Sequence, residues 1–192
     1  MIFERFQSWK IFVICFVVTA IAAAGLHGTA SAQSMPNPAT IVKPQTYVSL
    51  DKVPRGQTFE AAVVLEIAKG FHMNSNKPSE DYLIPTTITP NAPAGIRVVD
   101  TVYPLGQMKT FTFSPKKPLN VYSESVTLRL KLATDSSTPL GALSIPATLR
   151  YQACNDTACL PPVRVPVTVN VDVAAAGTSA HHVHADIFSE KH

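Results

Sequence analysis

Residues 163–173 read Val163-Arg-Val-Pro-Val-Thr-Val-Asn-Val-Asp-Val173, with valine at every odd-numbered position. An apolar residue at every second position is the pattern of a β-strand that buries one face and exposes the other. Branched valine side chains also pack well on a pleated surface. This stretch therefore predicts a long, half-buried strand, and the rest of the chain can be interpreted outward from it.

The same alternation recurs in earlier parts of the chain. Strong matches are residues 58–68, 126–132 and 143–153, and weaker candidates are residues 46–50, 86–89, 96–103 and 109–113. Sixteen prolines, spread throughout, argue against long helices. About eight short strands joined by Gly, Pro, Asn and Asp turns predict an all-β fold, an antiparallel β-sandwich. Pro146 and Pro166 must then lie at strand edges or bulges.

Two cysteines, Cys154 and Cys159, lie between the last two predicted strands. A disulfide needs α-carbons about 4.4–6.8 Å apart, whereas five extended residues would separate them by about 16 Å. The chain must therefore turn back, and Asn155-Asp156 are good turn formers. We expect a hairpin with a four-residue loop, in which the cysteines face each other as a cross-strand pair at one end of the sandwich.

The size of this loop bears on what the bridge is for. Closing so short a loop stabilises a fold by only about 2 kcal/mol, against nearly 5 kcal/mol for a loop of about a hundred residues. Hairpin disulfides are also readily strained and accessible, as labile or catalytic bridges are. An inert structural bridge, such as many exported domains carry, is the alternative that the spacing leaves open.

The first 32 residues predict a secretory signal peptide. Arg5 and Lys10 precede an apolar run at residues 11–26, and Ala30-Ser31-Ala32 supplies a cleavage site after Ala32. Cys15 would leave with the leader, so the mature chain would keep two cysteines in the periplasm, where disulfides persist. Membrane contact is expected only through the leader during export.

The remaining chain divides into three parts by composition. Residues 33–45 are expected to be a flexible lead-in, residues 46–173 the β-sandwich domain, and residues 174–192 a disordered tail that contains His181, His182 and His184. The formal charge of +3 falls to +2 without Glu4, Arg5 and Lys10. That charge is too small to indicate a nucleic-acid partner.

Four segments carry a resemblance to a known family. They are Gly70-Phe-His-Met-Asn-Ser-Asn-Lys-Pro78, Tyr82-Leu-Ile-Pro-Thr86, Pro118-Leu-Asn-Val-Tyr122 and Tyr151-Gln-Ala-Cys-Asn-Asp-Thr-Ala-Cys-Leu-Pro-Pro162. Together they resemble the N-terminal periplasmic domain of the thiol:disulfide interchange protein DsbD, over about residues 46–173. The most specific part is the Tyr-Gln-x-Cys stretch that ends in Cys-x-Pro-Pro.

The resemblance implies an immunoglobulin-like sandwich in which Cys154 and Cys159 are a redox-active pair. Family members pass electrons from a membrane-embedded reductase to periplasmic thioredoxin-like proteins, in processes such as cytochrome c maturation. On this view Cys159 makes the intermolecular bond, no cofactor is needed, and the protein is a thiol–disulfide oxidoreductase component. Full-length DsbD continues into membrane and thioredoxin-like domains, which this protein is expected not to carry. The expected partners are therefore thioredoxin-like periplasmic proteins and a separate membrane reductase.

The chain departs from the family at positions near the cysteines. Its cysteine loop is one residue shorter than in the best-studied member, and His72 and Asn74 replace aromatic residues that line the pocket there. An imidazole beside the pair could favour a thiolate or relay a proton, although a solvent-facing loop histidine fits equally well. Phe113 is the candidate cap residue, with a plain core role as the alternative, and Tyr151 is a further candidate pocket residue.

Two other functions stay open at this point. One is a non-catalytic immunoglobulin-like binding domain with a structural disulfide. The other is a copper- or zinc-binding periplasmic protein, for which the cysteines, His72 and the tail histidines would be ligands. The sequence assigns no residue to a metal site.

Overall fold

Twelve strands lie within residues 35–189, which are the residues that this computed structural model describes. The first sheet has the strand order β1 (Val42–Val48), β3 (Thr58–Ile67), β9 (Ser125–Thr134) and β6 (Ile96–Val102). The second has the order β2 (Val53–Pro54), β12 (Val163–Ala174), β10 (Gly141–Tyr151) and β5 (Thr87–Pro90). All pairs in these sheets are antiparallel except β2 with β12. The predicted all-β, immunoglobulin-like sandwich is confirmed.

The core lies between these two sheets. On β12 the even-numbered residues from Thr168 to Asp172 are exposed, and the valines at 167, 169, 171 and 173 are buried. They pack in one apolar cluster with side chains of the facing sheet, including Leu128, Leu130 and Leu132 of β9. Burying each side chain of this size stabilises the fold by about 1.5–3 kcal/mol. The alternation in the sequence therefore gives the sandwich directly.

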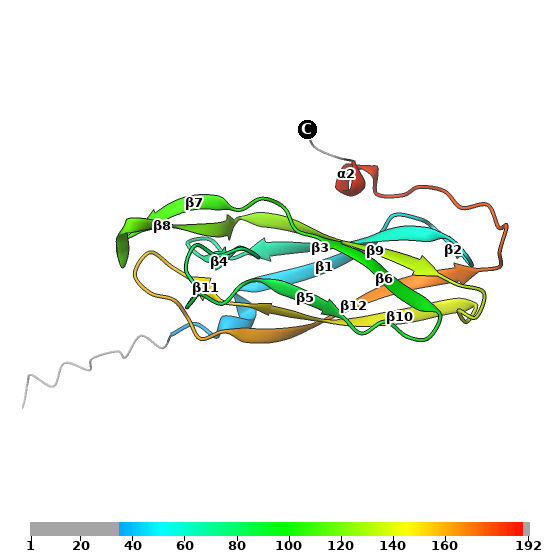
Figure 1. Ribbon diagram of the computed structural model, residues 1–192, viewed down its shortest axis with the longest axis horizontal. Helices are drawn as coiled ribbons and strands as arrows, with labels where there is room; N and C mark the ends of the chain where they lie inside the picture. The colour runs from blue at the N-terminus through cyan, green and yellow to red at the C-terminus, as the bar shows by residue number, and fades with distance from the viewer. Residues whose placement is uncertain (1–34, 190–192) are drawn as a thin grey trace, which may run out of the picture. The chain divides into compact units, whose positions relative to one another are not determined.

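A third sheet lies at one end of the sandwich, at the left of Figure 1. Its order is β11 (Ala153–Cys154), β4 (His72–Asn74), β8 (Ser114–Ser123) and β7 (Gln107–Phe111). It continues strands of both main sheets, because β10 runs into β11 through Gln152 and β8 runs into β9 through Glu124. A small apolar cluster supports it, made of Leu83, Phe111, Leu119 and Val121. The cysteines are thus mounted on an extension of the main framework.

Pro146 of β10 and Pro166 of β12 lie where one side of the strand is open. β5 pairs with β10 only over residues 147–150, so Pro146 lies just beyond the end of β5. β2 pairs with β12 only at Val173 and Ala174, so the outer side of β12 is open at Pro166 among the described strands. The missing amide donors therefore break no ladder bond on those sides, as predicted.

The lead-in predicted for residues 33–45 differs from the structure from residue 38 onward. A 3-10 turn at Pro38–Thr40 leads into β1, which pairs with β3 from Val42. Ile41 and Val42 are buried, and the Tyr151 hydroxyl donates a 2.7 Å hydrogen bond to the Pro38 carbonyl oxygen. Two apolar side chains are enough to anchor this segment, although its proline content hides the strand pattern.

The tail predicted to be disordered is also placed, as far as Ser189. After β12 the chain returns past β1, where Val183 N–H donates to the Ser49 carbonyl and the His181 ring lies 3.1 Å from the Asp51 carboxylate. A short helix, α2 (Ala185–Phe188), follows, and Arg129 of β9 donates to the carbonyl oxygens of Ile187 and Ser189. We call residues 175–189 the C-terminal strap. Main-chain groups and single charged side chains hold it, so apolar periodicity gives no sign of it.

Two further points concern the ends of the chain. The predicted signal peptide, residues 1–32, lies outside the described residues. Within residues 35–189, no helix has the length and apolar character needed to cross a membrane.

Candidate redox site

The two cysteines form a disulfide across a tight hairpin. Cys154 and Cys159 pair as an antiparallel bridge, with 2.02 Å between the sulfurs. Their α-carbons are 3.9 Å apart, which is closer than the range of about 4.4–6.8 Å expected from the sequence. Residues 155–158 form the loop between them. The predicted cross-strand pair in a four-residue loop is therefore present.

Asn155 organises this loop. Its side-chain oxygen accepts hydrogen bonds from the main-chain amides of Thr157 and Ala158, at 2.9 and 2.8 Å, and from the Thr157 hydroxyl. Its own amide donates to the Ala158 carbonyl oxygen at 2.9 Å. An asparagine side chain that imitates a backbone turn in this way is the reason for expecting a reversal here.

The two sulfur-bearing residues differ in exposure. Cys154 is 1% exposed, whereas Cys159 is partly exposed. The chain after Cys159 is fixed by Leu160, whose amide donates to the Ala153 carbonyl at 2.8 Å. A large partner can therefore approach Cys159 more easily than Cys154.

His72 lies directly beside the disulfide. In the pairing of β4 with β11, His72 is opposite Cys154. Directly opposite residues of an antiparallel pair project their side chains to the same face, at about 4.5–5.5 Å between β-carbons. His72, Cys154 and Cys159 thus form a row across three adjacent segments. The turn before β4 contains Gly70 with φ of 83°, which lets the chain reverse and bring His72 to this row.

The His72 ring is nearly buried and contacts a cation. Its exposure is 7%, and Lys109 Nζ lies 2.6 Å from Nε2. Burial of the imidazole, followed by the Lys109 ammonium, lowers the pKa of His72, and the Asp156 carboxylate opposes this. A solvent-facing histidine, the alternative raised from the sequence, does not describe this residue.

The turn between β7 and β8 packs against the cysteine loop. The amide and the hydroxyl of Thr112 both donate to the Asp156 carbonyl oxygen, the amide at 3.2 Å. Phe113 stacks on Phe111 at 5.2 Å between ring centroids, and Phe111 meets the His72 ring edge-on at 5.3 Å. Phe113, 40% exposed, is thus carried by a turn that is bonded to the cysteine loop.

An open groove of about 580 Å³ adjoins this site. Its charged and titratable lining residues come from four separate segments, namely Lys69, His72, Lys109, Glu124 and Asp156. Two cations and two anions surround the imidazole, so the groove has mixed charge.

Two predicted pocket residues have structural positions instead. Asn74 is fully buried, and its side-chain amide donates to the Ile84 carbonyl and to the Gln152 side chain, each at 3.1 Å. Tyr151 is fully buried in the main core. Both hold the framework behind the cysteines. The tail histidines lie on the strap near Asp51 and Tyr47, and residues 35–189 contain no group of three or more His, Cys, Asp or Glu that could hold a metal ion.

Sequence reasoning did not identify Lys109, Phe111 and Thr112. They reach the cysteines through the pairing of β4 with β8 and of β8 with β7. The sequence signal was the weak alternation at residues 109–113, which marked a strand without indicating its neighbours. For Asp156 the sequence predicts only a position in the turn between the cysteines.

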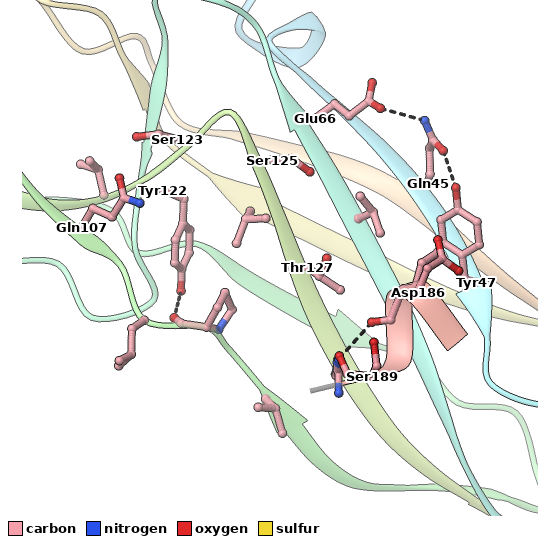
Figure 2. A pocket seen from close by; sticks show the side chains of 18 residues that line it. Gln45, Tyr47, Glu66, Gln107, Tyr122, Ser123, Ser125, Thr127, Asp186 and Ser189 are labelled. Carbon is pink, nitrogen blue, oxygen red and sulfur yellow. Dashed lines mark hydrogen bonds between the residues drawn. The ribbon is translucent and has the colours of Figure 1, made fainter. Parts of the chain in front are cut away.

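A larger hollow of about 760 Å³ lies on the outer face of the first sheet, between that sheet and the strap (Figure 2). Gln45 bonds both Glu66 and Tyr47 at its edge, and Asp186 and Ser189 of the strap line it. Neither cysteine lines this hollow. It shares Gln107 and Ser123 with the groove beside His72, so it lies next to the candidate redox site but does not include the cysteines.

The fold and the site together are an immunoglobulin-like sandwich that carries a hairpin disulfide at one end. The sequence model of the family described as "Thiol:disulfide interchange protein DsbD, N-terminal" matches residues 38–171. The chain belongs to this family, and thiol–disulfide exchange is the function class that the membership supports.

Two solved structures illustrate the likeness. The N-terminal domain of DsbD from Neisseria meningitidis, in its reduced form, is 18% identical with a TM-score of 0.45, covering 80% of this chain and 98% of that one. The N-terminal periplasmic domain of ScsB from Proteus mirabilis is 13% identical with a TM-score of 0.48, covering 72% of this chain and 49% of that one. Among curated protein sequences, no match was found.

Proposed function

We propose that this protein is a periplasmic thiol–disulfide exchange module that relays electrons through Cys154 and Cys159. The observation that carries the proposal is the asymmetric hairpin disulfide, in which a partly exposed Cys159 is bonded to a buried Cys154. Such a pair can open without disturbing the main core. The family membership supports the same chemistry.

In the proposed reaction the reduced domain attacks an oxidised partner. The Cys159 thiolate attacks one sulfur of the partner disulfide, that bond breaks, and the partner's second sulfur leaves as a thiolate. Cys154, as its thiolate, then attacks the Cys159 sulfur and releases the partner's first sulfur. Two electrons pass to the partner, the partner thiolates take up two protons, and the domain ends with its own disulfide.

The proposed partners follow from this chemistry. Oxidised thioredoxin-like periplasmic proteins would accept the electrons, and a separate membrane reductase or a reduced thioredoxin-like protein would restore the dithiol. A cleaved signal peptide would deliver the domain to the periplasm. These partners are an extension of the family resemblance.

Phe113 is proposed as the cap of this site. It lies in the turn that Thr112 bonds to the cysteine loop, and it is supported from below by Phe111. Opening of this turn would give a partner access to Cys159, and closing it would protect the disulfide from small thiols.

Trapping of mixed disulfides tests the proposal. Cys154→Ala leaves Cys159 unable to complete the second step, so it should accumulate an adduct with a thioredoxin-like partner. Cys159→Ala should give much less adduct, because Cys154 is 1% exposed. If neither variant forms an adduct, and the wild-type bridge has a potential below about −300 mV as structural disulfides do, the bridge is inert and the proposal fails.

A further inference from the structure

We propose that His72 donates a hydrogen bond to the sulfur of Cys154 when the disulfide opens, and that Lys109 fixes the imidazole tautomer that makes this possible. The inference rests on the proposed exchange at Cys154 and Cys159. It makes His72 and Lys109 positioning residues for the Cys154 sulfur. This sulfur leaves when the disulfide is attacked and is the nucleophile that resolves the mixed disulfide.

The contact with Lys109 determines where the His72 proton lies. An ammonium group has only donors, so at 2.6 Å from Lys109 Nζ the Nε2 atom must be the acceptor. A neutral imidazole that accepts at one nitrogen carries its proton on the other. His72 therefore presents an N–H group at Nδ1.

Among residues 35–189 of the oxidised protein, this Nδ1–H group completes no hydrogen bond. The nitrogen is buried and unpartnered, in a side chain that is 7% exposed. The Cys154 backbone lies close enough to favour the charged imidazole slightly, but it does not complete a hydrogen bond by distance and angle. Buried polar groups are nearly always paired, so an unpaired donor beside a disulfide calls for a partner that appears in another state.

The reduced state supplies such a partner. His72 and Cys154 are opposite each other across β4 and β11, with side chains on the same face. In the disulfide the Cys154 sulfur is a poor acceptor, whereas a thiolate is a charged one. Hydrogen bonds to charged groups are roughly twice as strong as those between neutral groups.

The imidazole keeps its proton throughout the exchange step. An incoming thiolate attacks the Cys159 sulfur, the Cys154–Cys159 bond breaks, and its electron pair remains on the Cys154 sulfur. The new thiolate accepts the hydrogen bond from Nδ1–H. Stabilising the leaving thiolate lowers its pKa and speeds its departure, and the same thiolate is the nucleophile in the reverse direction.

The charges around the imidazole include equal numbers of cations and anions, so the Nδ1–H group is the feature expected to act on the Cys154 sulfur. Lys109 of β7 and Lys69 of the β3–β4 turn face the groove, as do Glu124 between β8 and β9 and Asp156 of the cysteine loop. Their charges balance in number. Burial and Lys109 keep the imidazole neutral, which preserves the tautomer described above.

The first experiment measures the pKa of the Cys154 thiol in a Cys159→Ser background, from the pH dependence of alkylation by iodoacetamide. His72→Phe removes the donor, and the pKa of the Cys154 thiol should rise by about one to two pH units, the size expected for a lost hydrogen bond to a charged group. His72→Asn can place an amide donor near the Nδ1 position and should restore at least half of the difference. His182→Phe, on the strap, is the matched control and should change nothing.

The second experiment tests the tautomer in the oxidised wild-type protein, using the nitrogen resonances of the His72 ring. They should show Nδ1–H and a bare Nε2. Lys109→Met should allow the other tautomer to appear, whereas Lys109→Gln, which can still donate to Nε2, should keep Nδ1–H predominant. This readout remains available if the His72 variants fail to fold.

An Nε2–H tautomer in the wild type, or a Cys154 thiol whose pKa is the same with and without His72, overturns the inference. Neither result depends on a partner protein. If mixed disulfides form as proposed but the His72 and Lys109 variants change neither the pKa of the Cys154 thiol nor the His72 tautomer, the proposed electron relay is supported and the role of His72 is wrong. If no mixed disulfide forms but the pKa of the Cys154 thiol depends on His72, the hydrogen bond from His72 is supported and the proposed exchange is wrong.

Discussion

Thr112 and Asp156 are joined by two hydrogen bonds, because the amide and the hydroxyl of Thr112 both donate to the Asp156 carbonyl oxygen. Thr112 belongs to the turn between β7 and β8, and Asp156 belongs to the loop between the cysteines. The cysteine loop is therefore held from outside by a segment 44 residues away in the chain. The turn and the loop should consequently open together.

Replacing Thr112 with valine should loosen this contact. The hydroxyl bond is lost while the amide bond remains, at a cost of about 1 kcal/mol, which corresponds to about a fivefold larger open population. Reduction of the disulfide by dithiothreitol should accelerate by that factor if the turn protects it. Thr148→Val, at an exposed position on β10, is the control. Equal reduction rates in both variants would show that the turn does not gate the bridge.

Asn155→Ala should make the disulfide less favourable. The asparagine side chain accepts three hydrogen bonds that hold the loop closed. Losing them should cost about 1–1.5 kcal/mol and lower the equilibrium constant for forming the bridge about tenfold, measured against a glutathione buffer. Asn170→Ala, on the exposed face of β12, should leave it unchanged. A similar constant in the Asn155 variant would mean that the strands alone bring the sulfurs together.

Tyr151→Phe should affect stability and spare the redox chemistry. The change removes the hydrogen bond to the Pro38 carbonyl oxygen and keeps the buried ring. The free energy of unfolding in urea should fall by about 0.5–1.5 kcal/mol. The rate of disulfide reduction should stay the same, because the hydroxyl points to the start of the domain. A large change in the rate of disulfide reduction would show that Tyr151 is a residue of the redox pocket.

The stability of the oxidised protein should decline as the pH falls below about 6.5. The pKa of His72 is lowered from its usual 6.5 in the folded protein, so the unfolded chain takes up this proton at a higher pH than the folded protein. The stability that depends on a neutral His72 is fully present above pH 6.5. It is lost as the pH falls from 6.5 to the lower pKa that His72 has in the folded protein. Urea unfolding at pH 7.5 and 5.5 measures this loss.

His72→Phe provides the comparison for that measurement, since it should remove this part of the pH dependence. Asp51 and Asp135 also have lowered pKa values, but their contributions are present above the unfolded value of 3.8 and are lost only below it. They therefore do not interfere in the chosen window. A wild type and a His72 variant with the same pH profile would contradict the prediction.

The sandwich and the hairpin could be predicted because both depend on local patterns. Alternating valines specify β12, and Asn155 specifies the reversal between the cysteines. Lys109 could not be placed, because its contact with His72 joins residues 37 apart through two strand pairings that the sequence does not state. β8 was missed since its first half is exposed and carries two lysines and two prolines.

The strap and the start of the domain were missed for a different reason. Main-chain hydrogen bonds to Ser49 and Asp51 place the strap, and any sequence offers such groups. Two side-chain contacts add to these bonds. His181 pairs with Asp51, and Arg129 donates to two carbonyl oxygens of the strap. Composition alone cannot distinguish a tail with these few anchors from one without them.

The two sulfurs belong to one hairpin, five positions apart, and the core between the main sheets includes neither of them. Breaking the bond therefore frees only a small ring of backbone, and we expect both oxidation states to keep the same framework. In the proposed exchange such a molecule would need no refolding between rounds, so its turnover could follow the supply of reductant. It also offers chaperones and proteases no more unfolded chain when reduced than when oxidised.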